Sequence, residues 1–360
     1  MIPRLLRRLL RLGCVVVIVL VVLGAVAALL SSDVRYVLRG AVAEAGILWR
    51  RRPIVEVVGD SATDRATREK LLLVIAARAY AADSLHLAVG ETFTTYSTVD
   101  RDTLVLVLSA SRRDRLAAYT WSYPIVGRVP YKGFFDFALA AREAKRLQRA
   151  GLDTYVRPSD AFSTLGWFND PLLSTVVGED SVELAATVIH EVTHNTLFVR
   201  GHVDFNESFA TFVGYRGAEA FFRSRGQTRL ADRAAARWRD EVRLSRFYGV
   251  LVDRLNVLYV SGMSGPALEA AREQLFRQSA DELAGPLEPT FETIDARRLA
   301  RRPLNNAVVL AVQVYLTRLG EFDQVLAASG DLRTVIARIV SRAGSGGDPW
   351  AALAGSLEGS

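Results

Sequence analysis

The stretch "VIHEVTHNTLFVRGHVDFNESFATF", residues 188–212, contains three of the four histidines of a 360-residue chain. His190 and His194 are four residues apart, Glu191 follows the first of them, and Glu207 begins a second apolar pattern. Residues four apart on a helix lie on one face, one turn apart. Their imidazoles can therefore take adjacent corners of a zinc tetrahedron, with Glu191 beside the metal. The stretch predicts two helices joined by a short turn.

A histidine pair at this spacing can also be an ordinary core pair on an apolar helix. With only four histidines in the chain, chance placement of the pattern would be rare, on the order of one chain in several hundred. We therefore interpret His190 and His194 as zinc ligands. Glu191 is positioned to act as the general base on a water molecule.

A catalytic zinc usually has three protein ligands, and the sequence offers His202, Asp204 and Glu207 for the third place. The metzincin spacing would need a histidine at position 200, which is Arg200. We favour Glu207, with Asn206 as the N-cap of its helix, because a turn of this length can fold the second helix back onto the first. His202 and Asp204 remain alternatives.

Second-shell partners should fix the ligand geometry. Thr211, one turn beyond Glu207, is a candidate for bonding a ligand histidine, and Asp204 and Asn206 are alternatives. If such a zinc ion polarises a carbonyl group of a substrate, the charge that develops on the carbonyl oxygen also needs a hydrogen-bond donor. The candidates are Tyr315, Tyr259 and Tyr131, and the sequence does not choose among them.

The N-terminus departs from the rest of the chain. Residues 1–12, "MIPRLLRRLLRL", precede an apolar run over 13–30, long enough as a helix to span roughly 27 Å. We expect an N-terminal membrane anchor over 1–32, with the rest of the chain on the non-cytoplasmic side of the membrane. A cleavable signal peptide ending near 25–27 is the alternative.

Composition limits the possible functions of the remaining chain. The pI is near 9.6, but acidic residues accompany the arginines and no nucleic-acid-binding module is present, so no nucleic-acid partner is expected. The single cysteine, Cys14, lies in the apolar run, so any metal must be held by histidines and carboxylates.

Hydrophobic periodicity predicts an α+β domain that is predominantly helical, over 33–342, followed by a flexible Gly/Ser-rich tail over 343–360. Extended segments are expected first and helices after them. The expected segments are helices over 64–82 and 137–151, strands over 103–108 and 153–158, an interrupted extended stretch over 119–131, and helices almost throughout from 206.

The order His-Glu-x-x-His followed by Asn-Glu-Ser-Phe-Ala resembles the zinc helices of gluzincins such as alanyl aminopeptidase, with a shorter interval here. A closer resemblance is to the bacterial family of predicted zinc aminopeptidases, which are membrane-attached envelope proteins. It implies that the anchor lies in a bacterial inner membrane and that the catalytic domain is on the periplasmic side. It covers roughly residues 45–325 and rests on the zinc segment and four further stretches: "RRRPI" (50–54), "TWSYPIVGRVPYKGFF" (120–135), "AFSTLGWFNDPLLST" (161–175) and "NNAVVLAVQVY" (305–315).

This resemblance implies a gluzincin-like fold, one Zn²⁺ per chain and a peptide substrate. Where the family is expected to have a cysteine pair, this chain has Ser122 and Arg128. By its position in the chain, one segment corresponds to the gluzincin edge strand that pairs with substrate, although it can equally be an aromatic-rich loop. Its residues are Ser163, Thr164, Leu165, Gly166 and Trp167.

The resemblance does not fix the type of cleavage. An aminopeptidase needs a carboxylate for the substrate's free ammonium group, and on position alone Asp170 and Asp204 are candidates. An endopeptidase remains an alternative. So does a non-catalytic protein with a structural zinc, although such sites usually have a fourth protein ligand and favour cysteine.

Overall fold

The computed structural model describes residues 32–99, 103–123, 127–159 and 171–356. The chain divides into two compact units between Arg50 and Arg51. In the first unit, the described part consists of helix α2 (Ser32–Trp49) and Arg50. Everything below concerns the second unit.

The expectation of a transmembrane helix is corrected. Among the residues that the structure describes, no helix combines the length and the apolar character needed to cross a membrane. The apolar run over 13–30, on which the expectation rested, lies outside the described residues. The single-pass inner-membrane placement that followed from it is therefore not supported.

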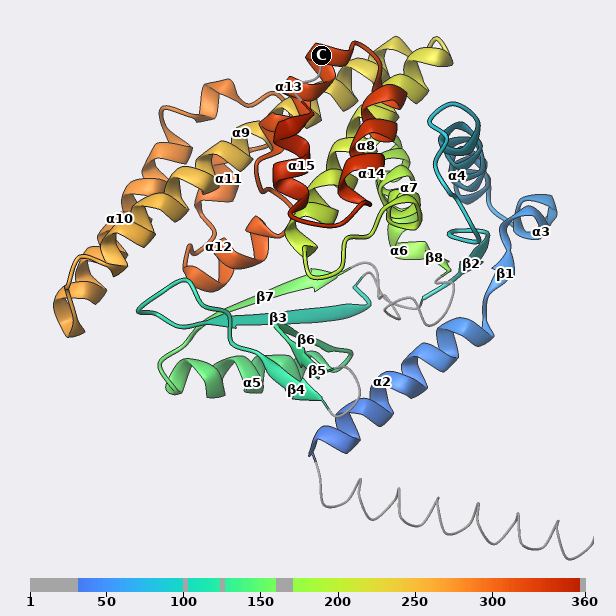
Figure 1. Cartoon of the computed structure of the whole chain (residues 1–360). Coiled ribbons are helices and arrows are strands. Elements are labelled where there is room, and N and C mark those ends of the chain that lie inside the picture. The colour runs from blue at the N-terminus through green and yellow to red at the C-terminus, as the bar shows by residue number, and fades with distance from the viewer. Residues whose placement is uncertain (1–31, 100–102, 124–126, 160–170, 357–360) are drawn as a thin grey trace, which may run out of the picture. The chain divides into compact units, whose positions relative to one another are not determined.

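The second unit is predominantly helical and contains short strands, so the expected α+β class is confirmed (Figure 1). The strands are β1 (Arg52–Pro53), β2 (Thr95–Ser97), β3 (Val105–Ser111), β4 (Trp121–Tyr123), β5 (Gly127–Val129), β6 (Tyr131–Phe134), β7 (Asp153–Ser159) and β8 (Leu172–Leu173). The helices are α3 (Ile54–Gly59), α4 (Arg65–Asp83), α5 (Phe137–Arg149), α6 (Ser174–Val177), α7 (Ser181–Thr196), α8 (Val203–Ser224), α9 (Thr228–Tyr259), α10 (Gly265–Ala284), the 3-10 turn η1 (Glu288–Thr290), α11 (Ala296–Ala300), α12 (Asn306–Gln313), α13 (Leu319–Ser329), α14 (Leu332–Ala343) and α15 (Pro349–Gly355).

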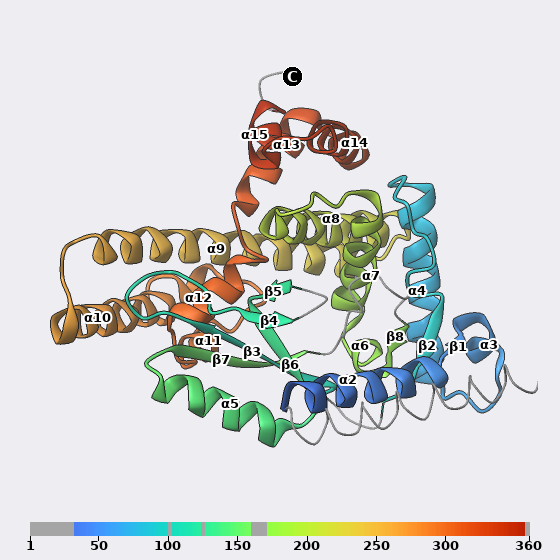
Figure 2. The ribbon, with the colours of Figure 1, turned by 60° about the horizontal axis from the view of Figure 1, so that its bottom comes forward.

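The main sheet has the strand order β6-β3-β7, and both pairings are antiparallel. Helix α5 lies against one face of this sheet, and α12 lies against the other (Figures 1 and 2). A smaller sheet, β1-β2-β8, combines one antiparallel and one parallel pairing. Strands β4 and β5 form a hairpin. The main sheet thus lies between α5 and α12.

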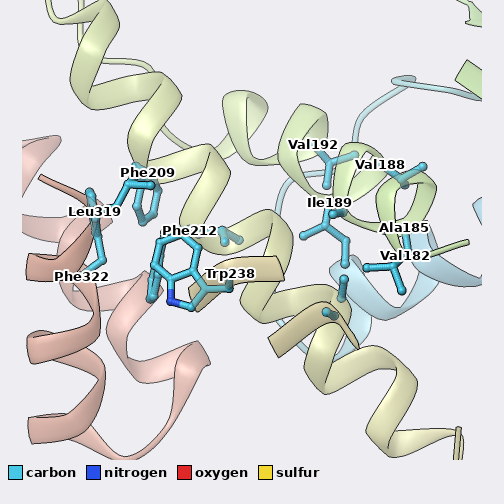
Figure 3. Close-up of a cluster of buried hydrophobic side chains, with 14 of the residues drawn as sticks. Val182, Ala185, Val188, Ile189, Val192, Phe209, Phe212, Trp238, Leu319 and Phe322 are labelled. Atoms are coloured by element: carbon cyan, nitrogen blue, oxygen red, sulfur yellow. The ribbon is translucent and has the colours of Figure 1, made fainter. Parts of the chain in front are cut away.

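Helix α7 buries one apolar stripe in the core. Val182, Ala185, Ile189 and Val192 recur every three or four residues and are all buried, as the helical period requires. They lie in one apolar cluster with residues of α8, α9 and α13, among them Phe212, Trp238 and Phe322 (Figure 3). Burying a large apolar side chain such as Ile189 or Phe212 contributes about 1.5–3 kcal/mol to the stability of the fold. The polar stripe of α7, which includes His190 and His194, therefore faces away from the core.

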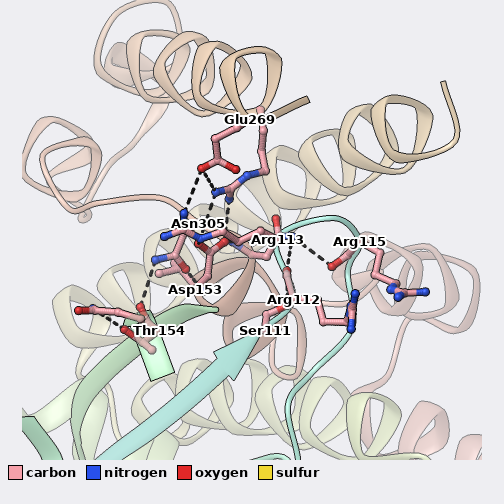
Figure 4. Close-up of polar contacts among 12 residues, drawn as sticks. Ser111, Arg112, Arg113, Arg115, Asp153, Thr154, Glu269 and Asn305 are labelled. Carbon is pink, nitrogen blue, oxygen red and sulfur yellow. Dashed lines mark hydrogen bonds and ion pairs between the residues drawn. The ribbon is translucent and has the colours of Figure 1, made fainter. Parts of the chain in front are cut away.

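An ion-pair cluster with a buried centre joins the sheet to the helices. We call it the Asp153 cluster; it consists of Arg113, Asp153, Glu269, Arg272 and Asn306. Arg272 Nη1 donates to Asp153 Oδ2 at 2.7 Å, and the backbone amide of Asn306 donates to the same oxygen at 3.0 Å. Arg113 Nε lies 3.2 Å from Asp153 Oδ1 (Figure 4). The cluster connects the start of β7 with α10 and α12.

Most expected elements occur close to their predicted positions. Helices 64–82 and 137–151 correspond to α4 and α5, and strands 103–108 and 153–158 correspond to β3 and β7. The C-terminal tail differs from expectation, because α15 buries Trp350 and Leu353 within it. The boundaries predicted between anchor and domain at 32/33, and between domain and tail at 342/343, stay predictions.

Candidate active site

The candidate site is built on the antiparallel pair α7 and α8. Asp180 caps α7 by accepting hydrogen bonds from the amides of Val182 and Glu183. Gly214 lets the two helices approach closely, since a Cβ there would lie 2.8 Å from the carbonyl oxygen of Ala186 and 3.2 Å from His190 Cβ. A side chain at position 214 would therefore push α8 away from the histidines.

The turn between the helices is closed by Asn206. Its Oδ1 accepts from the Val199 amide at 2.8 Å, and its Nδ2 donates to the Val199 carbonyl at 2.9 Å. The prediction that Asn206 caps the helix is wrong: α8 begins four residues after Val199, with His202 at the N-cap position. The amide of Asn206 stabilises the preceding turn, not the helix end, and it fixes the backbone next to Glu207.

Three donor atoms converge between the helices. His190 Nε2 lies 3.2 Å from His194 Nε2 and 3.2 Å from Glu207 Oε2, and His194 Nε2 lies 3.7 Å from Glu207 Oε2. A tetrahedral zinc with bonds of about 2.0–2.1 Å separates its ligand atoms by about 3.3–3.4 Å. We call these three atoms the donor triangle. Its size and its nitrogen and oxygen donors fit a zinc ion.

The electrostatic environment favours the metal-binding forms of Glu207 and His194. Burial opposes a charge on His190, but the hydrogen bond with Glu207 and the charge of Glu191 raise the pKa of His190 above its ordinary value. Burial and the charge of His190 lower the pKa of His194 to about 4. Burial would raise the pKa of Glu207, but the two histidines and Arg157 hold it below its usual value. At neutral pH Glu207 is thus a carboxylate and His194 a neutral imidazole, the forms that bind metals.

The alternatives for the third ligand lie elsewhere. Of the His, Cys, Asp and Glu side chains that the structure describes, only His190, His194 and Glu207 bring donor atoms together in this way. Asp204 Oδ2 accepts from Trp350 Nε1 at 3.1 Å, which ties α8 to α15. His202 lies at the start of α8 and is not a member of the group. The expected metal ligands are therefore brought together with Glu207 in the third place.

The expected base, Glu191, lies on α7 between the histidines and is half-buried. Its charge raises the pKa of both His190 and Tyr315. The carboxylate is thus electrostatically linked to the donor triangle and to the tyrosine beyond it.

The three candidate tyrosines do not all lie in one part of the structure. Burial and the charge of Glu207 raise the pKa of Tyr315 to about 12, and the same two causes raise the pKa of Tyr131. Tyr259 instead donates to Asn306 Oδ1 at 2.7 Å, beside the Asp153 cluster. Tyr315 follows α12, and its segment is attached to α8 because the Thr317 amide donates to Ser208 Oγ at 3.1 Å. The structure thus brings Tyr315 and Tyr131 to the site, and not Tyr259.

The remaining predicted residues have mixed outcomes. Thr211 lies on the same side of α8 as Glu207 and lines a cavity with His190. Within the described residues, no hydrogen bond joins it to either histidine. Residues Ser163 to Trp167 and Asp170, predicted to contact substrate, lie outside the described residues.

Two functional candidates were missed by sequence reasoning. Arg157 on β7 is half-buried, and its charge lowers the pKa of Glu207, Tyr131 and Tyr315. Glu241 on α9 is buried and lines the same cavity as His190. Nothing in the local sequence distinguishes either residue from other charged residues of a strand or helix, because only the tertiary fold brings them to the histidines.

A model of the family described as "Putative aminopeptidase" matches residues 35–344. The chain belongs to this family. The matched region contains the donor triangle, Glu191, Arg157, Glu241 and Tyr315. Searches of curated proteins and of solved structures found no match. The family's description indicates a peptidase, so the site can be considered in terms of peptide-bond hydrolysis.

Proposed function

We propose that the protein is a zinc-dependent aminopeptidase of the gluzincin type, which hydrolyses peptide bonds at the site between α7 and α8. The observation that carries the proposal is the donor triangle, whose sides of 3.2, 3.2 and 3.7 Å fit three corners of a zinc tetrahedron. Among the described residues, three side chains supply ligand atoms at this site. Structural zinc sites normally have four protein ligands, whereas catalytic sites keep one position for water or substrate.

Zinc bound here by His190, His194 and Glu207 would acidify water towards a pKa of about 7 and polarise the carbonyl of the bond to be cut. The carboxylate of Glu191 accepts the proton of the attacking water, whose oxygen bonds to the carbonyl carbon. Glu191 then delivers this proton to the amine nitrogen as the carbon–nitrogen bond breaks. Its position on α7, one residue after a ligand, suits both steps.

The charge that develops on the carbonyl oxygen needs a hydrogen-bond donor. Tyr315 and Arg157 both interact electrostatically with Glu207. Arg157 precedes the histidine motif in the sequence, and Tyr315 follows it. Because burial keeps the pKa of Tyr315 high, its hydroxyl stays protonated at neutral pH and can donate. Arg157 provides a second donor and a fixed positive charge.

The first test measures metal content and hydrolysis together. The full chain is compared with its Glu191→Gln and Glu207→Ala variants by mass spectrometry of bound metal and by assays on aminoacyl amides and internally quenched peptides. We expect about one zinc per chain in the parent and in Glu191→Gln, and weakened zinc binding in Glu207→Ala. Hydrolysis should fall about 10²–10⁴-fold in Glu191→Gln, because the general base is lost.

The control is Glu219→Gln, a carboxylate on α8 that pairs with Arg216 and Arg223. It should retain both zinc and activity. Stoichiometric zinc without hydrolysis of any substrate would contradict the catalytic proposal and assign the zinc a structural role. A preference for quenched internal peptides over aminoacyl amides would make the protein an endopeptidase.

A further inference from the structure

A cavity of about 220 Å³ opens beside the donor triangle. Its walls come from α7, α8, α9 and the segment after α12, and they include His190, Thr187 and Tyr315. Helices α7, α8 and α9 pack against one another (Figure 2). For comparison, a cavity of about 150 Å³ in another protein holds benzene. The space is therefore sufficient for the amino end or the side chain of one amino-acid residue.

The cavity has a carboxylate in its wall. Glu241 lines it together with His190 and is a buried residue of α9, with a side chain that is 10% exposed. Burial raises the pKa of Glu241, and the charges of Glu183 and Asp240 act in the same direction, while Arg237 opposes them. A cation in the cavity would offset the unfavourable burial of this charge.

The groups behind Glu241 leave an excess of negative charge. Arg237 Nη2 lies 2.7 Å from Glu241 Oε1, and Arg237 Nε lies 3.3 Å from Glu183 Oε1. Tyr215 donates to the other Glu183 oxygen at 2.8 Å. One guanidinium is thus shared by two carboxylates, and of these three charged groups it is Glu241 that lines the cavity. The charge arrangement favours a positively charged ligand there.

We propose that this cavity is the subsite for a cationic nitrogen of the substrate, an ammonium group that hydrogen-bonds to Glu241 while the adjacent carbonyl lies at the donor triangle. The inference rests on the proposed function and specifies its substrate class. Two sources share this chemistry: the free α-ammonium of an N-terminal residue and the side-chain ammonium of a lysine. The first source would make Glu241 the residue that restricts cleavage to chain ends.

The test measures binding without hydrolysis. The full chain, freed of metal by a chelator, is titrated by calorimetry with L-leucinamide, N-acetyl-L-lysinamide and the neutral reference N-acetyl-L-leucinamide. We expect at least one cationic ligand to bind about tenfold or more tightly than the reference, a difference of about 1.4 kcal/mol. Tighter leucinamide identifies the α-ammonium as the ligand, and tighter acetyl-lysinamide identifies the side chain.

The discriminating variant is Glu241→Gln, which keeps the shape and removes the charge. It should abolish the preference for the cation, whereas Glu219→Gln, outside the cavity wall, should leave it unchanged. If Glu241→Gln does not fold, Thr187→Leu, which narrows the cavity from α7, should weaken the cationic ligands instead. Equal binding of cationic and neutral ligands, or an unchanged preference in the folded variant, would overturn the inference.

These outcomes are separable from those of the proposed function. Cation binding that depends on Glu241 in a protein without hydrolytic activity would keep the subsite and reject the catalysis. Hydrolysis whose KM for free-amine substrates is the same in Glu241→Gln and the parent would keep the catalysis and reject the subsite.

Discussion

The donor triangle and the Asp153 cluster both combine carboxylates with basic side chains, but they are packed differently. In the Asp153 cluster, Arg272 and Asp153 are each 5% exposed, and the oxygens of Asp153 receive donors from three residues. In the donor triangle the side chains of His190, His194 and Glu207 remain 17%, 23% and 21% exposed. The buried charges of the cluster are paired with one another, whereas the three donor atoms of the triangle point to one partly exposed place. Buried charge alone therefore does not identify a functional site; convergence and access do.

The largest effect on stability is expected for a substitution in the Asp153 cluster. Asp153→Ala leaves Arg272 buried without its main partner, and it should lower the free energy of unfolding by about 3–5 kcal/mol. Denaturant unfolding measures this change. The matched control is Asp114→Ala in the neighbouring loop, an exposed partner of Arg112, which should cost under about 1 kcal/mol. Equal effects of the two substitutions would remove the distinction drawn above.

A second substitution affects the site through the backbone. Gly214→Ala places a Cβ 2.8 Å from the Ala186 carbonyl oxygen, so α8 must shift, with a loss of about 1–3 kcal/mol in unfolding free energy. Because the shift separates Glu207 from the histidines, zinc affinity should fall as well. Gly249→Ala on α9, where a Cβ meets nothing within 4 Å, is the control and should be neutral or stabilising. Unchanged zinc affinity in a folded Gly214→Ala variant would show that close helix packing does not position the donors.

The smallest effect concerns Asp240, a buried carboxylate that accepts backbone amides of Glu292, Thr293 and Ile294. Burial would raise its pKa, but these hydrogen bonds lower it below the ordinary 3.8. A depressed pKa in the folded state means that the carboxylate stabilises the protein above pH 3.8 and that this contribution is lost as the pH falls through the folded-state pKa. Asp240→Asn should therefore cost about 1 kcal/mol at pH 7, and less in acid.

Unfolding of the Asp240→Asn variant and the parent between pH 7 and pH 2.5 tests this expectation. Asp232→Asn, an exposed position on the same helix, should change stability by less than about 0.5 kcal/mol at every pH. A parent-to-variant difference that grows as the pH falls would contradict the assignment of a charged Asp240.

Local periodicity was sufficient to predict the helices that carry the histidine motif, because the stripe of Val182, Ala185, Ile189 and Val192 is a property of one short segment. It did not predict the role of Asn206, whose side chain bonds to Val199 in the turn and not to an amide of its own helix. The packing of α15 was also missed. Its two large buried apolar residues, Trp350 and Leu353, lie in a segment rich in glycine and serine, which obscured the apolar signal.

The rest of the candidate site depends on long-range packing. Arg157 is on β7, which pairs with β3 across the main sheet, and Glu241 is on α9. Neither has a spacing relation to His190 that a sequence pattern could express. Tyr315 was one of three candidates among which the sequence did not choose, and its segment is joined to α8 by the hydrogen bond from Thr317 to Ser208.

The connection between α7 and α8 spans only residues 197–202, fastened by Asn206. Helical hairpins of this kind form from local contacts, which assemble quickly during folding. The donor triangle can therefore come together as soon as this hairpin forms. Tyr131, Arg157, Glu241 and Tyr315 arrive only when β6, β7, α9 and the segment after α12 have docked. Contact order therefore predicts that the three donor atoms come together before the groups that surround them, and that a partly folded chain can already bind a cation.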